Sequence, residues 1–179
     1  MISRIKKYSL LVGIAVVIIV LDQWTKTLVR NGLAFGDSWA PWEWLMPYAR
    51  IVHWNNTGVA FGMFQGYGMF FTVLALVVAA VIVYYYPRVP VEEWPLRIAM
   101  GMQLGGALGN LIDRVTNNGQ VTDFISVGNF AVFNIADASI SVGVVVLLLG
   151  MWWKDRADAK KAAAAQNLEP KVEESGPSE

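Results

Sequence analysis

The chain has 179 residues, of which 55% are hydrophobic, with no cysteine, one histidine and a formal net charge of zero. The lack of cysteine excludes disulfides, thiolate metal sites and cysteine nucleophiles, and the single histidine excludes a histidine-cluster metal site. The zero net charge argues against nucleic acid as a partner. The mean hydropathy of +0.44 is typical of an integral membrane protein.

The apolar residues are concentrated in four blocks, 9–28, 67–86, 96–113 and 135–153. About 20 apolar residues in a helix cross a hydrocarbon core about 30 Å thick. The sequence therefore predicts an all-α membrane bundle of four transmembrane helices in a single domain, residues 1–154. The polar tail, 155–179, is expected to extend the last helix, to become partly disordered and to carry no chemistry.

The basic residues indicate how the bundle is oriented. With four crossings, both termini and the loop 87–96 share one side. That side and its flanks hold ten basic residues: Arg4, Lys6, Lys7, Arg88, Arg97, Lys154, Arg156, Lys160, Lys161 and Lys171. The other side holds four: Lys26, Arg30, Arg50 and Arg114. The positive-inside rule places both termini in the cytoplasm and the segments 31–66 and 114–134 outside.

The first outer segment, 31–66, is unusually rich in tryptophan, with Trp39, Trp42, Trp44 and Trp54. Tryptophan favours the membrane–water interface, and the stretch "ARIVHW" alternates weakly, as a short strand does. We expect a small β-rich or amphipathic platform on the outer face, between the first two helices. The alternative is a loop whose tryptophans only anchor the helices.

The third block carries Gly101, Gly105 and Gly109 at four-residue spacing, followed by "GNLIDR". Such glycines allow a neighbouring helix to approach closely, so packing is the simpler interpretation. Asn110 and Arg114 share a helix face. The amide of Asn110 needs a partner inside the bundle. Arg114 could clamp substrate, or it could only pair with the adjacent Asp113.

Asp22 lies in the first block, where an aspartate at the centre of a membrane helix costs roughly 2.5–3.5 kcal/mol. Lys26 follows one turn later and is a candidate ion-pair partner. A structural role and a role in a site are both open for Asp22.

Asn134 and Asp137 stand before the last apolar block in the spacing of a helix N-cap, with Asp137 near the positive end of the helix dipole. Capping alone is therefore one interpretation. Asp123, between Thr122 and Phe124, fits neither a turn nor a cap. With cysteine and clustered histidine excluded, carboxylates are the groups left for chemistry. Two neighbouring carboxylates share one proton, so the ionised one can activate water while the other polarises a carbonyl. The helix dipole favours Asp137 as the ionised partner.

Five motifs occur in order along residues 10–153: "DQWTK" (22–26), "NNTGVAFG" (55–62), "GGALGNLIDR" (105–114), "VTDF" (121–124) and "FNIAD" (133–137). In this set and order the chain resembles lipoprotein signal peptidase, also called signal peptidase II, a bacterial intramembrane aspartic protease. The resemblance implies that Asp123 and Asp137 are catalytic. It also implies that seven residues bind substrate or support the site: Asp22, Asn56, Gly105, Gly109, Asn110, Arg114 and Asn134.

The resemblance implies cleavage of prolipoproteins just before a diacylglyceryl-modified cysteine, at the outer leaflet of the bacterial cytoplasmic (inner) membrane. It further implies no cofactor or metal and inhibition by the cyclic peptide globomycin. We also expect contact with membrane lipids and a monomer. Family members often have alanine where this chain has Val59, a difference that bears on substrate preference.

Three other functions remain as alternatives. A small proton-coupled carrier also uses intramembrane acids, but its acids should be spread toward both faces. A serine-based intramembrane protease would need His53 as its base. A purely structural protein held together by Asn and Gly contacts would leave Asp123 without a role.

Overall fold

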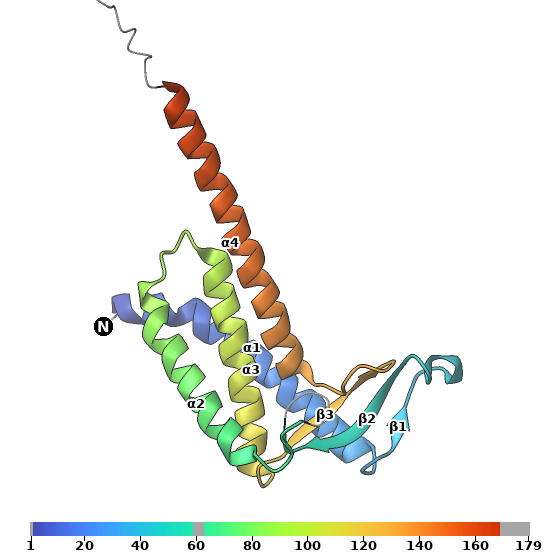
Figure 1. Ribbon diagram of the computed structural model, residues 1–179. Helices are drawn as coiled ribbons and strands as arrows, with labels where there is room; N and C mark the ends of the chain where they lie inside the picture. The colour runs from blue at the N-terminus through green and yellow to red at the C-terminus, as the bar shows by residue number, and fades with distance from the viewer. Residues whose placement is uncertain (1, 59–62, 169–179) are drawn as a thin grey trace, which may run out of the picture.

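The computed structural model describes residues 2–58 and 63–168, and within them the chain forms four long helices and one small sheet (Figure 1). The helices are α1 (Ile2–Gly32), α2 (Gly68–Tyr85), α3 (Trp94–Thr116) and α4 (Ile135–Leu168). The strands are β1 (Ser38–Trp39), β2 (Ala49–Asn56) and β3 (Val121–Val127). Two short 3-10 helices complete this part of the chain, η1 (Glu43–Leu45) and η3 (Tyr86–Arg88).

Helix α3 is the central element of the bundle and packs against α1, α2 and α4. A Cβ atom at Gly105 would lie 2.8 Å from the Ile18 Cβ and 3.0 Å from the Ala15 Cα, so α1 approaches α3 at backbone distance. On the neighbouring face, a Cβ atom at Gly106 would lie 2.5 Å from the carbonyl oxygen of Ala136 in α4. The packing role expected for these glycines is confirmed.

Three helices in the described residues are long and apolar enough to cross a membrane, over Lys7–Gly32, Gly68–Arg88 and Ile135–Lys160. These segments expose many valine and leucine side chains on their outer surfaces, and the protein is a helical membrane protein. Helix α3, expected as the fourth crossing, is not among the three helices that are long and apolar enough to cross a membrane. Its buried residues include Arg97, Asn110 and Asp113, so much of its surface contacts protein rather than lipid.

The helices also extend beyond the apolar blocks. Helix α4 continues from the expected end at 153 to Leu168, through a segment rich in alanine and lysine, which are strong helix formers. Likewise, α1 begins at Ile2 and α3 ends at Thr116. The last part of the predicted tail, 169–179, lies outside the described residues.

The sheet is antiparallel in the order β1-β2-β3. The weak alternation around residues 49–54 predicted β2 correctly. β3 was not predicted, and the expectation that the platform is built from 31–66 alone is corrected, because this third strand comes from the segment between α3 and α4. Its pairing partner lies far earlier in the chain, with Trp54 opposite Asp123 and Asn56 opposite Val121.

The sheet lies at the end of the bundle where α1 and α3 finish and where α2 and α4 begin (Figure 1). The aromatic side chains of the sheet and of the β1–β2 connection remain exposed, including Trp39, Trp42, Trp44 and Trp54. Trp42 and Trp44 stack with their ring centroids 6.0 Å apart. This end of the molecule therefore presents tryptophan rings beside the apolar helices.

Candidate active site

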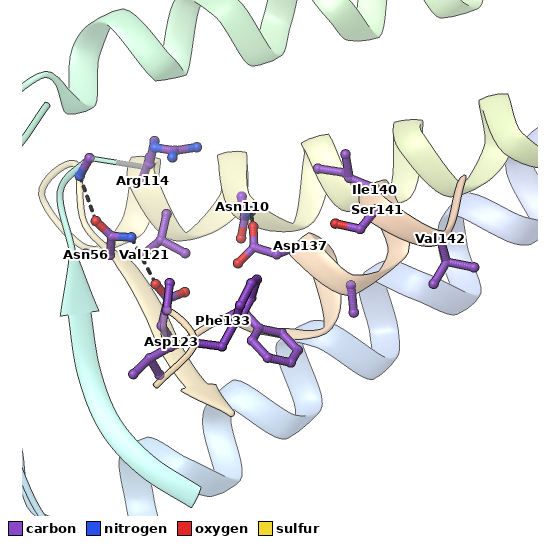
Figure 2. Close-up of a pocket in the computed structure, with 15 residues that line it drawn as sticks. Asn56, Asn110, Arg114, Val121, Asp123, Phe133, Asp137, Ile140, Ser141 and Val142 are labelled. Atoms are coloured by element: carbon purple, nitrogen blue, oxygen red, sulfur yellow. Dashed lines mark hydrogen bonds between the residues drawn. The ribbon is translucent and has the colours of Figure 1, made fainter. Parts of the chain in front are cut away.

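Asp123 and Asp137 come from different elements but line one cleft (Figure 2). Asp123 lies in β3, and Asp137 lies in the first turn of α4. The cleft has a volume of about 420 Å³, and Asn56, Asn110 and Arg114 also line it. The structure thus brings together five of the nine residues expected at the site within one concave surface.

Asn134 joins the two aspartates, although it is completely buried and does not line the cleft. Its side-chain Nδ2 donates to Asp123 Oδ1 at 2.7 Å, and its backbone N–H donates to Asp137 Oδ2 at 3.2 Å. In return, its Oδ1 accepts from the backbone N–H of Asp137 at 3.0 Å. The two backbone bonds form a reciprocal helix cap. The capping interpretation is therefore confirmed, and the same residues also shape the cleft.

Two further asparagines complete the hydrogen bonding of the aspartate pair. Asn56 Nδ2 donates to Asp123 Oδ2 at 3.0 Å, and Asn110 Nδ2 donates to Asp137 Oδ1 at 2.8 Å. Each of the four carboxylate oxygens thus accepts a hydrogen bond from an uncharged N–H group. These bonds fix the direction of both side chains, and no cation of the described residues forms an ion pair with either carboxylate.

The surroundings of Asp123 favour its protonated form. Asp123 is only 2% exposed. Burial raises the pKa of Asp123 to about 7, and the nearby charge of Asp137 adds to that rise. The amides of Asn56 and Asn134 and the charge of Lys26 act in the opposite direction. Near neutral pH, Asp123 can therefore hold or release a proton.

Behind the cleft lies a second cluster, here called the inner network: Asp22, Gln23, Lys26, Arg30 and Asp113. Lys26 Nζ lies 2.8 Å from Asp22 Oδ2 and 3.1 Å from Asp113 Oδ2. The expected pairing of Asp22 with Lys26 is confirmed. Asp22 does not line the cleft; its Oδ1 accepts from the backbone N–H of Ala136 at 2.9 Å, which fixes the start of α4.

Arg114 is not held by its neighbour Asp113. Asp113 instead contacts Lys26 and, at 3.5 Å, Arg30. The guanidinium of Arg114 lies 5.7 Å from the centre of the Phe71 ring, and its buried Nε has no hydrogen-bond partner among the described residues. Arg114 therefore stands at the edge of the cleft with hydrogen-bonding capacity to spare.

The two glycines expected at the site lie behind the cleft rather than in its wall. A Cβ atom at Gly109 would lie 2.8 Å from Asp22 Oδ2, so glycine leaves room for that carboxylate. Gly105 serves the α1–α3 contact described above. Gly58 does line the cleft. Residues 59–62 lie outside the described residues, and they include Val59, where family members often have alanine.

The sequence did not single out Gln23 or the apolar wall of the cleft. Gln23 Nε2 donates to Asp113 Oδ1 at 3.1 Å and to the Gly109 carbonyl oxygen at 3.0 Å. Its place on the same helix face as Lys26 and Arg30 was an available signal. The apolar wall is formed by eight residues: Val121, Phe130, Ala131, Val132, Phe133, Ala138, Ile140 and Val142.

In the part of the chain that the structure describes, no group of three or more His, Asp or Glu side chains could hold a metal ion. The side chains able to exchange protons in the cleft are carboxylates. This helical membrane protein has two aspartates linked through Asn134 in a cleft with an apolar wall. These are the features of an intramembrane aspartic hydrolase.

Comparison with known proteins is more specific. The family profile described as Signal peptidase (SPase) II matches residues 14–153. The lipoprotein signal peptidase of Mesorhizobium japonicum is 40% identical over 162 residues, covering 86% of this chain and 91% of that protein. The one from Bacillus pumilus is 42% identical over 142 residues, covering 77% and 89%.

A solved structure of a bacterial membrane enzyme, obtained by the in meso method, matches with a TM-score of 0.74 and 30% identity. The match covers 83% of this chain and 90% of that one. The chain belongs to the signal peptidase II family, and it is a peptide hydrolase of the aspartic type. The resemblance drawn from the five motifs is confirmed.

Proposed function

We propose that this protein removes the signal peptide from prolipoproteins by cleaving just before a cysteine that carries a diacylglyceryl group. The observation that carries the proposal is the pair Asp123 and Asp137, bridged by Asn134, in a cleft with an apolar wall. The relatives from Mesorhizobium and Bacillus are both named lipoprotein signal peptidases, which supports this class of substrate.

In the proposed reaction, the aspartate pair shares one proton. The ionised Asp137 takes a proton from a water molecule, whose oxygen attacks the scissile carbonyl carbon, while the protonated Asp123 gives its proton to the carbonyl oxygen. The tetrahedral intermediate then collapses, the C–N bond breaks, and the proton on Asp137 passes to the leaving amine. The carbonyl re-forms as its hydroxyl proton returns to Asp123, so one water molecule is consumed.

The surroundings of the two carboxylates support this division of roles. Asp137 lies in the first turn of α4, where the helix dipole stabilises an anion, and it accepts two N–H groups. Burial raises the pKa of Asp123, in β3, to about 7. Because the two groups interact, the pair titrates as a unit with two apparent pKa values.

The other residues of the site have supporting roles in the proposal. Asn56, Asn110 and Asn134 orient the carboxylates, and Asp22 with Gly109 fixes the junction of α1, α3 and α4. Arg114 binds an oxygen of the substrate, either a backbone carbonyl or a polar group of its lipid. The free Nε of Arg114 and its position on the cleft support that role.

For the membrane, we propose that α3 is the fourth crossing, surrounded by the three apolar helices. The 1–154 region forms the membrane domain, and the 155–179 tail is cytoplasmic with the N-terminus. The cleft then faces the outer leaflet of the cytoplasmic membrane, with the tryptophans at the interface. The apolar wall receives the lipidated substrate, and water reaches the aspartates from outside. The protein acts as a monomer.

The test is cleavage of a diacylglyceryl-modified prolipoprotein in detergent, without added metal. We expect Asp123→Asn and Asp137→Asn to lose at least a thousandfold in rate while remaining folded. Asp37→Asn is the matched control, because Asp37 is an exposed acid in the outer segment. Loss of activity only in the two site variants supports the proposal, and full activity in either one contradicts it.

The same purified protein, assayed in detergent for cleavage and in sealed vesicles for flux, separates the peptidase from the proton-coupled carrier. Asp22, Asp113, Asp123 and Asp137 gather at one end of the bundle, which favours the peptidase. Globomycin should block cleavage and protect the protein against thermal unfolding. An intact substrate, combined with proton or solute flux that depends on Asp123, would replace the peptidase with the carrier.

A further inference from the structure

The inner network contains a buried cation that the proposed reaction does not use. Lys26 is 0% exposed, and its ammonium group contacts three oxygens. They are Asp22 Oδ2 at 2.8 Å, Asp113 Oδ2 at 3.1 Å and Asn110 Oδ1 at 2.9 Å. An ammonium group has three N–H donors, so each finds one acceptor. Two of these contacts are to carboxylates, and the third, to Asn110, leads toward the cleft.

The third contact determines which way the Asn110 carboxamide points. A carboxamide has an acceptor oxygen on one side and an NH₂ donor on the other. Because the oxygen faces Lys26, the NH₂ group faces the cleft and donates to Asp137 Oδ1 at 2.8 Å. A flipped amide would set NH₂ against the ammonium and oxygen against the carboxylate. Lys26, together with Asn134 Nδ2, which donates to the same oxygen, therefore favours the orientation seen here.

The same oxygen connects Lys26 to Asp123. Asn134 Nδ2 contacts both Asn110 Oδ1 at 3.1 Å and Asp123 Oδ1 at 2.7 Å. Lys26 is thus linked to each aspartate through asparagine amides. The intervening groups are buried, so solvent screens the lysine charge weakly.

We propose that Lys26 is a positioning residue for the aspartate pair: its ammonium locks the Asn110 amide toward Asp137, and its charge keeps the pair at one proton rather than two. This inference rests on the proposed function, because it assigns Lys26 a role relative to that pair.

The other charged groups around the pair do not duplicate this role. Helix α1 supplies Asp22 and Arg30, and α3 supplies Asp113 and Arg114. Arg30 is bound to Asp113 and Thr122, and Arg114 stands at the open side of the cleft. Among the described cations, only Lys26 donates to an asparagine that in turn donates to an aspartate of the pair.

The test uses two charge-balanced double variants, Lys26→Met/Asp22→Asn and Lys26→Gln/Asp22→Asn. Both remove an ion pair as a unit and leave Arg30 with Asp113. Glutamine can still donate an N–H to Asn110, whereas methionine cannot. Asp22→Asn alone is the control, since it removes an anion and retains the lysine. The measurements are thermal unfolding in detergent and the pH dependence of kcat and KM on a lipidated peptide.

A lost cation raises the pKa of a nearby carboxyl group, by on the order of one unit at this range. Loss of the Asp22 anion acts in the opposite direction, so the effect of Lys26 is the difference between each double variant and Asp22→Asn alone. We expect both double variants to have a pH–kcat profile about one unit above that of Asp22→Asn. The methionine variant should also lose about tenfold or more in kcat at its optimum, with KM little changed. The glutamine variant should retain more of its kcat. Asp22→Asn alone should show no upward shift.

Folded double variants whose pH–kcat profile coincides with that of Asp22→Asn would overturn the inference, because the charge of Lys26 would then have no effect on the titration of the pair. Failure of both double variants to fold would also overturn it and assign Lys26 to the fold alone. The proposed function is tested separately. If the Asp123→Asn variant still cleaves the substrate, the aspartate mechanism is wrong, independently of the results for Lys26.

Discussion

Replacing Asp123 by asparagine should change how the stability of the protein depends on pH. In the folded protein, burial raises the pKa of Asp123 to about 7, against an ordinary value of 3.8. Below about pH 3.8 the group is protonated in both the folded and unfolded states. As the pH rises toward 7, the unfolded chain releases this proton before the folded protein does. Stability contributed by the protonated group is therefore lost between pH 4 and pH 7.

The size of this loss follows from the shift. A pKa difference of about three units at 1.36 kcal/mol each corresponds to on the order of 4 kcal/mol. Asparagine does not titrate, so the free energy of unfolding of Asp123→Asn should not fall in this way between pH 4 and pH 7. The substitution also sets an NH₂ group against one of the donors on Asn56 or Asn134. That costs about 1–3 kcal/mol at every pH.

The assay is thermal unfolding in detergent at pH 4 and at pH 8 for the unaltered protein, Asp123→Asn and Asp37→Asn. The asparagine variant should be the less stable protein at pH 4. The Tm of the variant minus the Tm of the unaltered protein should rise by on the order of 10 °C from pH 4 to pH 8. Asp37→Asn should follow the unaltered protein throughout. A difference between Asp123→Asn and the unaltered protein that is the same at both pH values would refute the raised pKa of Asp123.

Three further outcomes test other parts of the structure. Gly105→Val should lower the free energy of unfolding by about 2–3 kcal/mol or more, measured by thermal unfolding, because the side chain meets α1. Gly13→Ala is the control and should be neutral or stabilising, since nothing lies within 4 Å of its added Cβ. Asn134→Ala should cost about 2–4 kcal/mol, since it removes a cap and a buried donor together, and unchanged stability would contradict that. Arg114→Ala should raise KM on a lipidated peptide at least tenfold with little change in Tm; a large fall in Tm with KM unchanged would make Arg114 structural.

Local spacing explains why part of the site was predictable. Asp22 and Lys26 are one helical turn apart, so their ion pair follows from the period of the helix. Asn134 and Asp137 have the spacing of a cap, and that geometry is present. The candidate residues around Asp123 could also be identified from the sequence, because few other polar residues occur near the apolar blocks.

Contacts between distant elements could not be read in the same way. Asn56 reaches Asp123 because β2 pairs with β3, and nothing local to either strand specifies that register. Helix α3 was expected as a fourth crossing, yet its buried polar side chains depend on other helices: Asn110 accepts from Lys26 of α1 and donates to Asp137 of α4. Asp113 could have paired with adjacent Arg114, but α1 brings Lys26 and Arg30 to it instead.

The Asp22–Lys26 pair also bears on how the chain is made. Helix α1 is synthesised before α3, so it must enter the bilayer while Asn110 and Asp113 do not yet exist. A lone buried charge would oppose that insertion by a few kcal/mol. Because the two opposite charges are one turn apart on the same helix, they can pair with each other before α3 has been synthesised. The ion pair thus lets the first helix carry the lysine that its later partners require.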